Sequence, residues 1–123
     1  RGYNLLPKSD TVMSLDVYLR DPSAKYEVDA LYWANITHNL AEMADQAGIY
    51  KAMWRPEEIG INTAKDLIPI LETGLAGLKQ RPKHFEQFNA SNGWGLYEHF
   101  VPFVEEYLEA CKEYPEATVH ASR

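Results

Sequence analysis

The sequence has one cysteine, no long apolar run and few basic residues, and each shortage excludes a class of protein. A single cysteine, Cys111, cannot form a disulfide within the chain, which is typical of a protein kept in a reducing compartment. No stretch reaches about 18 consecutive apolar residues, and the first residues lack the apolar segment of a signal peptide. We therefore expect a cytoplasmic protein without a membrane partner.

The shortage of basic residues argues against a protein that binds a nucleic-acid duplex. The chain has 12 lysines and arginines against 18 aspartates and glutamates, which gives a formal charge of −6. Binding the phosphates of a duplex requires a basic surface instead. Walker and Rossmann glycine loops, a nucleophile elbow and the H-E-x-x-H pattern are also missing. We expect no cofactor, and a binding protein rather than an enzyme.

The pattern of apolar residues predicts an α+β fold. Residues 1–12 show no periodicity and are interpreted as an extension or a cloning remnant, and residues 13–123 as a single α+β domain. Alternation predicts strands over 12–20 and 26–34, joined as an antiparallel hairpin. The tail 117–122 also alternates and is predicted to pair beside the first strand. The expected sheet is small and antiparallel, with about three strands.

Helical periodicity predicts three to four helices packed on one face of this sheet. The first is expected from the junction at His38 to about Ala47, with a break at Arg55-Pro56 and a loop to Asn62. Longer helices are predicted over 63–80, capped by Asn62 or Thr63, and over 94–113, with a short turn at 83–88 between them. Proline residues are expected to disturb both long helices.

Hydrogen-bonding side chains gather at the predicted strand-to-helix junction, at Asn35, Thr37, His38 and Asn39. One interpretation is structural, with Thr37 or Asn35 capping the helix. A cap needs only one side chain, however, and the free N–H groups of a helix N-terminus attract phosphate or carboxylate. The alternative is therefore a ligand site, in which His38 donates a hydrogen bond or transfers a proton.

A second unusual stretch is Asn92-Gly93-Trp94-Gly95, which precedes the last predicted helix. The structural interpretation makes Asn92 a cap and places Trp94 on the buried side of the helix. Glycines at this position cost conformational entropy, which a cap alone does not require. The alternative is that Gly93 and Gly95 admit a ligand while Trp94 or Tyr97 stacks on a planar ring.

Two further patterns have structural and functional interpretations. His38 and Glu42 lie four residues apart and would form one edge of a metal site, but no other residue completes it, so we expect no metal.

Glu105, Glu109 and Glu113 form a row of like charges on the last predicted helix. This row is either a solvated face with lysine or arginine nearby or an acidic surface for a basic partner.

Several stretches together resemble a known group of proteins: N-I-T-H-N-L (35–40), W-R-P-E-E (54–58), the helix from Asn62 to Leu71, F-N-A-S-N-G-W-G-x-Y (88–97) and V-P-F-V-E-E-Y-L-E-A-C (101–111). Over nearly all of residues 13–123 the chain resembles a widespread family of small uncharacterised proteins from bacteriophages, prophages and bacteria. The resemblance implies a phage or mobile-element setting and assigns no catalytic residue. By analogy, such a protein would act on host physiology or defence, for example by sequestering a nucleotide signal.

Three functional hypotheses follow. The first is a module that binds a small, nucleotide-like molecule, and the second is an acidic inhibitor or adaptor of a host protein. The third is a small enzyme with His38 as general acid or base. A homodimer is left open. The predicted ligand-binding residues are Asn35, Thr37, His38, Asn39, Arg55, Asn92, Trp94 and Tyr97.

Overall fold

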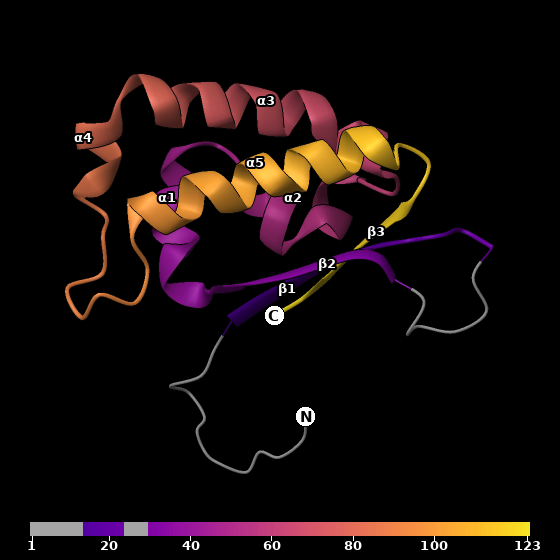
Figure 1. Ribbon diagram of the computed structural model, residues 1–123, viewed down its shortest axis with the longest axis horizontal. Helices are drawn as coiled ribbons and strands as arrows, with labels where there is room; N and C mark the ends of the chain where they lie inside the picture. The colour runs from indigo at the N-terminus through magenta and orange to yellow at the C-terminus, as the bar shows by residue number, and fades with distance from the viewer. Residues whose placement is uncertain (1–13, 24–29) are drawn as a thin grey trace, which may run out of the picture.

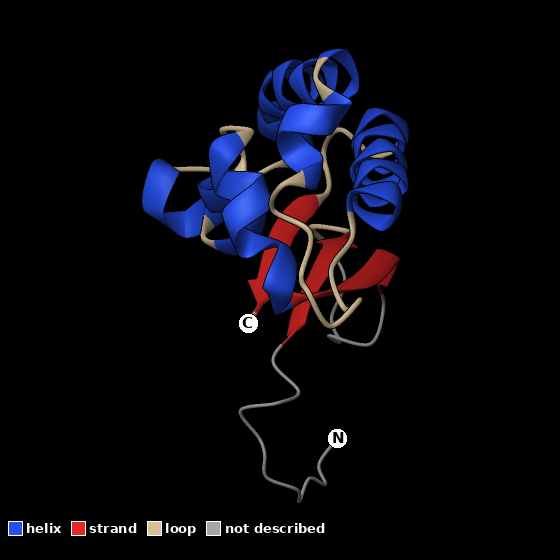
Figure 2. Cartoon of the chain, turned by 90° about the vertical axis from the view of Figure 1, so that its left-hand side faces the viewer, coloured by secondary structure: helices blue, strands red, loops and turns tan. Residues whose placement is uncertain are grey.

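A three-stranded antiparallel sheet supports a layer of helices, as the computed structural model of residues 14–23 and 30–123 shows. The strands are β1 (Ser14–Arg20), β2 (Ala30–Thr37) and β3 (Thr118–Ser122), in the order β2-β1-β3. The helices lie together on one face of the sheet (Figures 1 and 2). This arrangement confirms the predicted α+β class.

The strands follow the predicted alternation. Leu15, Val17 and Leu19 of β1 are completely buried, and the residues between them face outward. The register places Tyr18 opposite both Trp33 of β2 and His120 of β3, so these three residues share the outer face of the sheet. The antiparallel pairing of β1 with β2 and the third strand beside the first are confirmed. The predicted strand residues 12–13 and 26–29 lie outside the described ranges.

The segment after β2 differs from the prediction. β2 continues to Thr37, and a three-residue 3-10 helix, η2 (His38–Leu40), precedes α1 (Ala41–Gln46). The predicted loop before Asn62 instead contains the 3-10 helix η3 (Pro56–Ile59), and α2 (Tyr50–Trp54) was not predicted. Residues 52–54 of α2 are consecutive and all buried, so this short helix has no amphipathic period in the sequence.

The remaining helices are α3 (Ala64–Gln80), α4 (Pro82–Glu86) and α5 (Tyr97–Glu113). Both long helices continue through their internal prolines, Pro69 and Pro102. Thr63 occupies the N-cap position of α3 as predicted, but its side chain makes no capping bond. The backbone N–H of Ala64 instead donates to the carbonyl of Ala117 at 2.9 Å.

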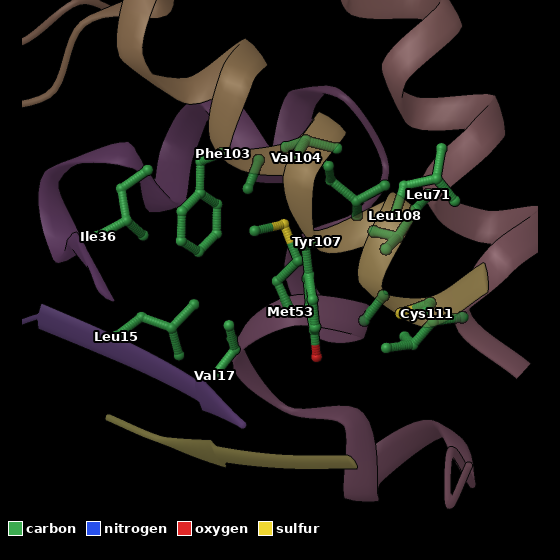
Figure 3. Close-up of a cluster of buried hydrophobic side chains, with 14 of the residues drawn as sticks. Leu15, Val17, Ile36, Met53, Leu71, Phe103, Val104, Tyr107, Leu108 and Cys111 are labelled. Carbon is green, nitrogen blue, oxygen red and sulfur yellow. The ribbon is translucent and has the colours of Figure 1, made fainter. Parts of the chain in front are cut away.

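The core lies between the sheet and the helices. Its largest completely buried side chains include Trp54, Tyr107 and Phe100. Figure 3 shows side chains of α5, among them Phe103 and Tyr107, pointing toward the sheet residues Leu15 and Val17. None of the helices in the described ranges combines the length and apolar character that crossing a bilayer requires.

Candidate functional site

The two polar stretches singled out in the sequence meet at the end of β2. The side-chain amide of Asn39 donates from Nδ2 to the carbonyl of Trp94 at 2.6 Å. Gly95 packs so closely that a Cβ at this position would lie 2.9 Å from the Cβ of Asn39 and 3.5 Å from Cγ2 of Thr37. The absence of a side chain at Gly95 therefore allows the loop before α5 to pack against Thr37 and Asn39. We call Thr37, Asn39 and residues 92–95 the junction site.

Thr37 is the cap of the junction, and Asn35 is not. The Thr37 hydroxyl oxygen accepts from the backbone N–H of Asn39 at 3.2 Å. Asn35 lies on the outer face of the sheet and donates from Nδ2 to Asp16 Oδ1 at 2.6 Å and to Ser14 Oγ at 3.2 Å. Of the two predicted caps, Thr37 is therefore confirmed, and Asn35 is excluded because β2 continues beyond it. An anion site at the helix start is not supported either, since the N–H of Asn39 is already bonded and η2 has only three residues.

The loop before α5 is held by bonds within itself. Asn92 Oδ1 accepts from the backbone N–H of Trp94 at 2.9 Å, and Asn89 Oδ1 accepts from that of Tyr97 at 2.7 Å. Asn89, which the sequence analysis did not single out, therefore bonds the first N–H of α5, and Asn92 shapes a turn instead. Gly93 and Gly95 have φ values of 80° and 128°, which glycine adopts most readily.

Trp94 is the most exposed of the large apolar side chains in the described residues, with 71% of its surface accessible. The prediction that it lies on the buried side of the last helix was wrong, because α5 begins only at Tyr97. The ring of Tyr97 is half-buried, and its hydroxyl donates to the carbonyl of Leu78 at 2.6 Å. Tyr97 thus joins α5 to α3, whereas Trp94 presents its ring to solvent.

His38 and Arg55 belong to a different group of side chains, which we call the Trp54 cluster. Trp54 donates from Nε1 to Nδ1 of His38 at 3.3 Å. An indole N–H can only donate, so Nδ1 of His38 is the acceptor in this bond. Trp54 also stacks on Tyr50, with ring centroids 5.5 Å apart, and the Tyr50 hydroxyl accepts from Nε of Arg55 at 3.2 Å.

The Trp54 cluster extends to the last residue of the chain. Arg123 donates from its guanidinium to the carbonyl of Trp54 at 2.9 Å and to Glu57 Oε2 at 3.3 Å. Trp54, Tyr50 and Arg123 were not predicted to lie beside His38, because no spacing along the chain relates them to it. Within the described ranges, His38 bonds to the indole of Trp54 rather than to a carboxylate or hydroxyl, so the cluster does not have the arrangement of a nucleophile with its general base.

The acidic side chains of α5 are partly compensated. Glu105 forms an ion pair with Lys79 of α3, and Glu109 lies 4.0 Å from the ammonium of Lys112. These pairs support the interpretation of the row as a solvated face with lysine nearby. Among the residues that the structure describes, no group of three or more histidine, cysteine, aspartate or glutamate side chains is placed to hold a metal.

The structure thus brings Thr37, Asn39, Asn92 and Trp94 together, and leaves the other predicted site residues elsewhere. Asn35 lies on the outer face of the sheet, and Tyr97 packs toward α3. No protein-family model, curated protein or solved structure matches the chain. The resemblance to phage and prophage proteins therefore stays a prediction, and function has to be argued from the geometry of the junction site.

Proposed function

We propose that the chain is a binding module that takes a planar, nucleobase-like small molecule on the ring of Trp94. The observation behind this proposal is the contrast between the exposed ring and its fixed backbone. Trp94 is 71% accessible, while its backbone N–H and C=O are both hydrogen-bonded. A large aromatic ring on a fixed backbone offers stacking area at a low cost in conformational entropy.

Two side-chain amides beside Trp94 have groups left for a ligand. Asn39 uses its Nδ2 and Asn92 its Oδ1 for bonds to the backbone of Trp94. Within the described part of the chain, no bond involves Asn39 Oδ1 or Asn92 Nδ2. One acceptor and one donor near a stacking ring suit the polar edge of a nucleobase. The formal charge of −6 favours recognition of the base rather than of a phosphate.

The resemblance to phage proteins directs the choice of ligands to test. A phage protein that acts in the host cytoplasm would meet nucleotide signals of the host. We therefore choose nucleosides, mononucleotides, cyclic dinucleotides and NAD as the panel. Each compound is tested by thermal shift, because a ligand that binds only the folded state raises Tm by mass action.

The matched variants are Trp94→Ala and Trp33→Ala. Both remove an exposed tryptophan, but Trp33 lies on the outer face of the sheet and is 57% accessible. We expect at least one compound to raise the Tm of the unchanged chain and of Trp33→Ala in a dose-dependent manner. Trp94→Ala should bind this compound about tenfold more weakly in isothermal titration, because one stacked ring contributes on the order of 1–3 kcal/mol. No shift across the panel, or equal losses in both variants, would refute the proposal.

A further inference from the structure

β2 forms an edge of the sheet, because β1 occupies only one of its two sides. In an antiparallel sheet, the N–H and C=O of every second residue point to the same side of the strand. About half of the eight residues of β2 therefore present backbone groups at the free edge, where no described strand pairs with them. Such an edge is a template for one more strand.

Apart from an irregularity in register at Leu31, the free edge of β2 lacks the features that block strand addition, and the pairing of Tyr32–Thr37 is regular. Edge strands are commonly protected by short length, by charged side chains or by proline. Residues Ala30–Thr37 include no charged residue and no proline, whereas β3 at the opposite edge has only five residues. Leu31 and Trp33 are also 40% and 57% accessible on the outer face of β2. The β2 edge is therefore the better site for an added strand.

The charge beside this edge indicates what occupies it. α5 packs over β2, and the pKa of the Tyr32 hydroxyl is raised by burial and then by the nearby charge of Glu106. Glu106 is exposed and has no ion pair within the described ranges, unlike Glu105, which pairs with Lys79. A second copy of this acidic chain, paired through β2, would bring two Glu106 carboxylates toward each other. A lysine or arginine side chain would instead be attracted.

We infer that the free edge of β2 binds an extended, basic segment of a partner protein as a fourth strand. Successive side chains of a strand point to opposite faces of the sheet. Lysine or arginine at every second position would therefore lie on the side of Glu106, and the apolar residues between them would contact Leu31 and Trp33. Backbone hydrogen bonds provide the affinity, and this alternation provides the specificity. Trp94 takes no part, so this site is separate from the proposed small-molecule site.

The probe is a capped peptide of about eight residues that alternates valine with lysine, matched by one that alternates valine with glutamate. Isothermal titration measures affinity, and hydrogen–deuterium exchange locates the binding. We expect only the lysine peptide to bind and to slow amide exchange in residues 30–37. Glu106→Lys should weaken binding on the order of tenfold. Glu86→Lys makes the same change of charge on α4 and should change the affinity less than about twofold.

Several outcomes would refute this inference. Equal binding of the glutamate peptide would exclude selection by charge, and equal effects of Glu106→Lys and Glu86→Lys would indicate attraction to the whole acidic chain. Slow exchange in β2 that depends on protein concentration without peptide would make a second copy the occupant. Trp94→Ala should bind the lysine peptide with unchanged affinity, and loss of binding in this variant would contradict the separation of the two sites.

Discussion

Two tyrosines of α5 place their hydroxyl groups in different surroundings. The Tyr107 side chain points from α5 toward the sheet, as Figure 3 shows, and its hydroxyl is buried without a hydrogen-bond partner among the described residues. The Tyr97 hydroxyl donates to the carbonyl of Leu78. A buried polar group that lacks a partner costs about 1–3 kcal/mol, whereas a hydrogen bond contributes about 1 kcal/mol. The same substitution should therefore act in opposite directions at these positions.

We expect Tyr107→Phe to raise the free energy of unfolding by about 1 kcal/mol, because it removes the unpaired hydroxyl and keeps the ring. Tyr97→Phe should lower it by about 1 kcal/mol, because it removes a bond between α5 and α3. Urea denaturation of both variants measures these changes. If Tyr107→Phe is as destabilising as Tyr97→Phe, its hydroxyl must be bonded, for example to a buried water molecule.

At the residue scale, the sequence located part of the candidate site. Thr37, Asn39, Asn92 and Trp94 were found because polar and glycine residues exceed what capping requires at both stretches. The small-molecule hypothesis requires the two stretches to meet, but spacing along the chain could not show that they do, because the contact between Asn39 and Trp94 spans 55 positions. The exposure of Trp94 was missed for a related reason. Trp94 lies just before α5, and an apolar residue at such a position is predicted to belong to the buried face of the helix as long as the first residue of the helix is not known.

Two glycines of α3 differ in what surrounds them. A Cβ at Gly74 would overlap Cγ2 of Ile49, a residue that is almost completely buried. A Cβ at Gly77, one turn later, would meet nothing within 4 Å. Alanine favours a helix interior by about 1 kcal/mol over glycine. Crowding in a packed core costs about 1–3 kcal/mol, which exceeds that gain.

We therefore expect Gly77→Ala to raise the free energy of unfolding by about 0.5–1 kcal/mol. Gly74→Ala should lower it by up to about 2 kcal/mol, the cost of displacing Ile49 less the gain in helix propensity. Thermal and urea denaturation give both values. A stabilised Gly74→Ala variant would show that Ile49 moves aside without loss, and that the close approach of α3 does not depend on glycine.

At the element scale, strands and helices with a regular spacing of apolar residues were predictable, and short elements were not. The alternation in β1 and β3 and the leucine spacing of α3 are properties of neighbouring residues, so the sequence identifies them. α2 has five residues, fewer than two helical turns, and its burial comes from contacts with distant segments. The end of β2 was predicted at Ala34, too early, because the strand's last residues alternate polar Asn35 and Thr37 with a single apolar residue.

At the scale of the whole molecule, a buried thiol and a buried tyrosine hydroxyl should make the free energy of unfolding fall as the pH becomes alkaline. Burial raises the pKa of the Cys111 thiol from its ordinary value of 9.0 to about 12, and burial also raises the pKa of Tyr107 well above its usual range. Each folded-state pKa exceeds the unfolded-state value, so the fold favours the protonated forms. The resulting stabilisation is fully present below the unfolded-state pKa and is lost as pH rises toward the folded-state pKa.

We expect the free energy of unfolding to fall above the ordinary thiol pKa of 9.0, by up to about 1.4 kcal/mol per pH unit for the thiol alone. Cys111→Ala should reduce the slope of this curve between about pH 9 and pH 10, and the slope that remains belongs to buried tyrosines, whose unfolded-state pKa is about 10. Urea denaturation across this range measures the slope, so a lower absolute stability of the variant does not affect the comparison. Equal slopes in both proteins would show that the thiol does not set the dependence.

The central position of β1 in the sheet means that one of its sides lacks its partner strand while the chain is being synthesised. β2 follows β1 closely in the chain, but β3 comes much later, and Thr118 bonds to Arg20 across 98 positions of the chain. At translation rates of about 5–20 residues per second, the second side of β1 stays open for roughly 5–20 s on the ribosome. During this interval a nascent chain exposes a strand that the finished fold covers on both sides, and it is then that binding by a chaperone would matter most.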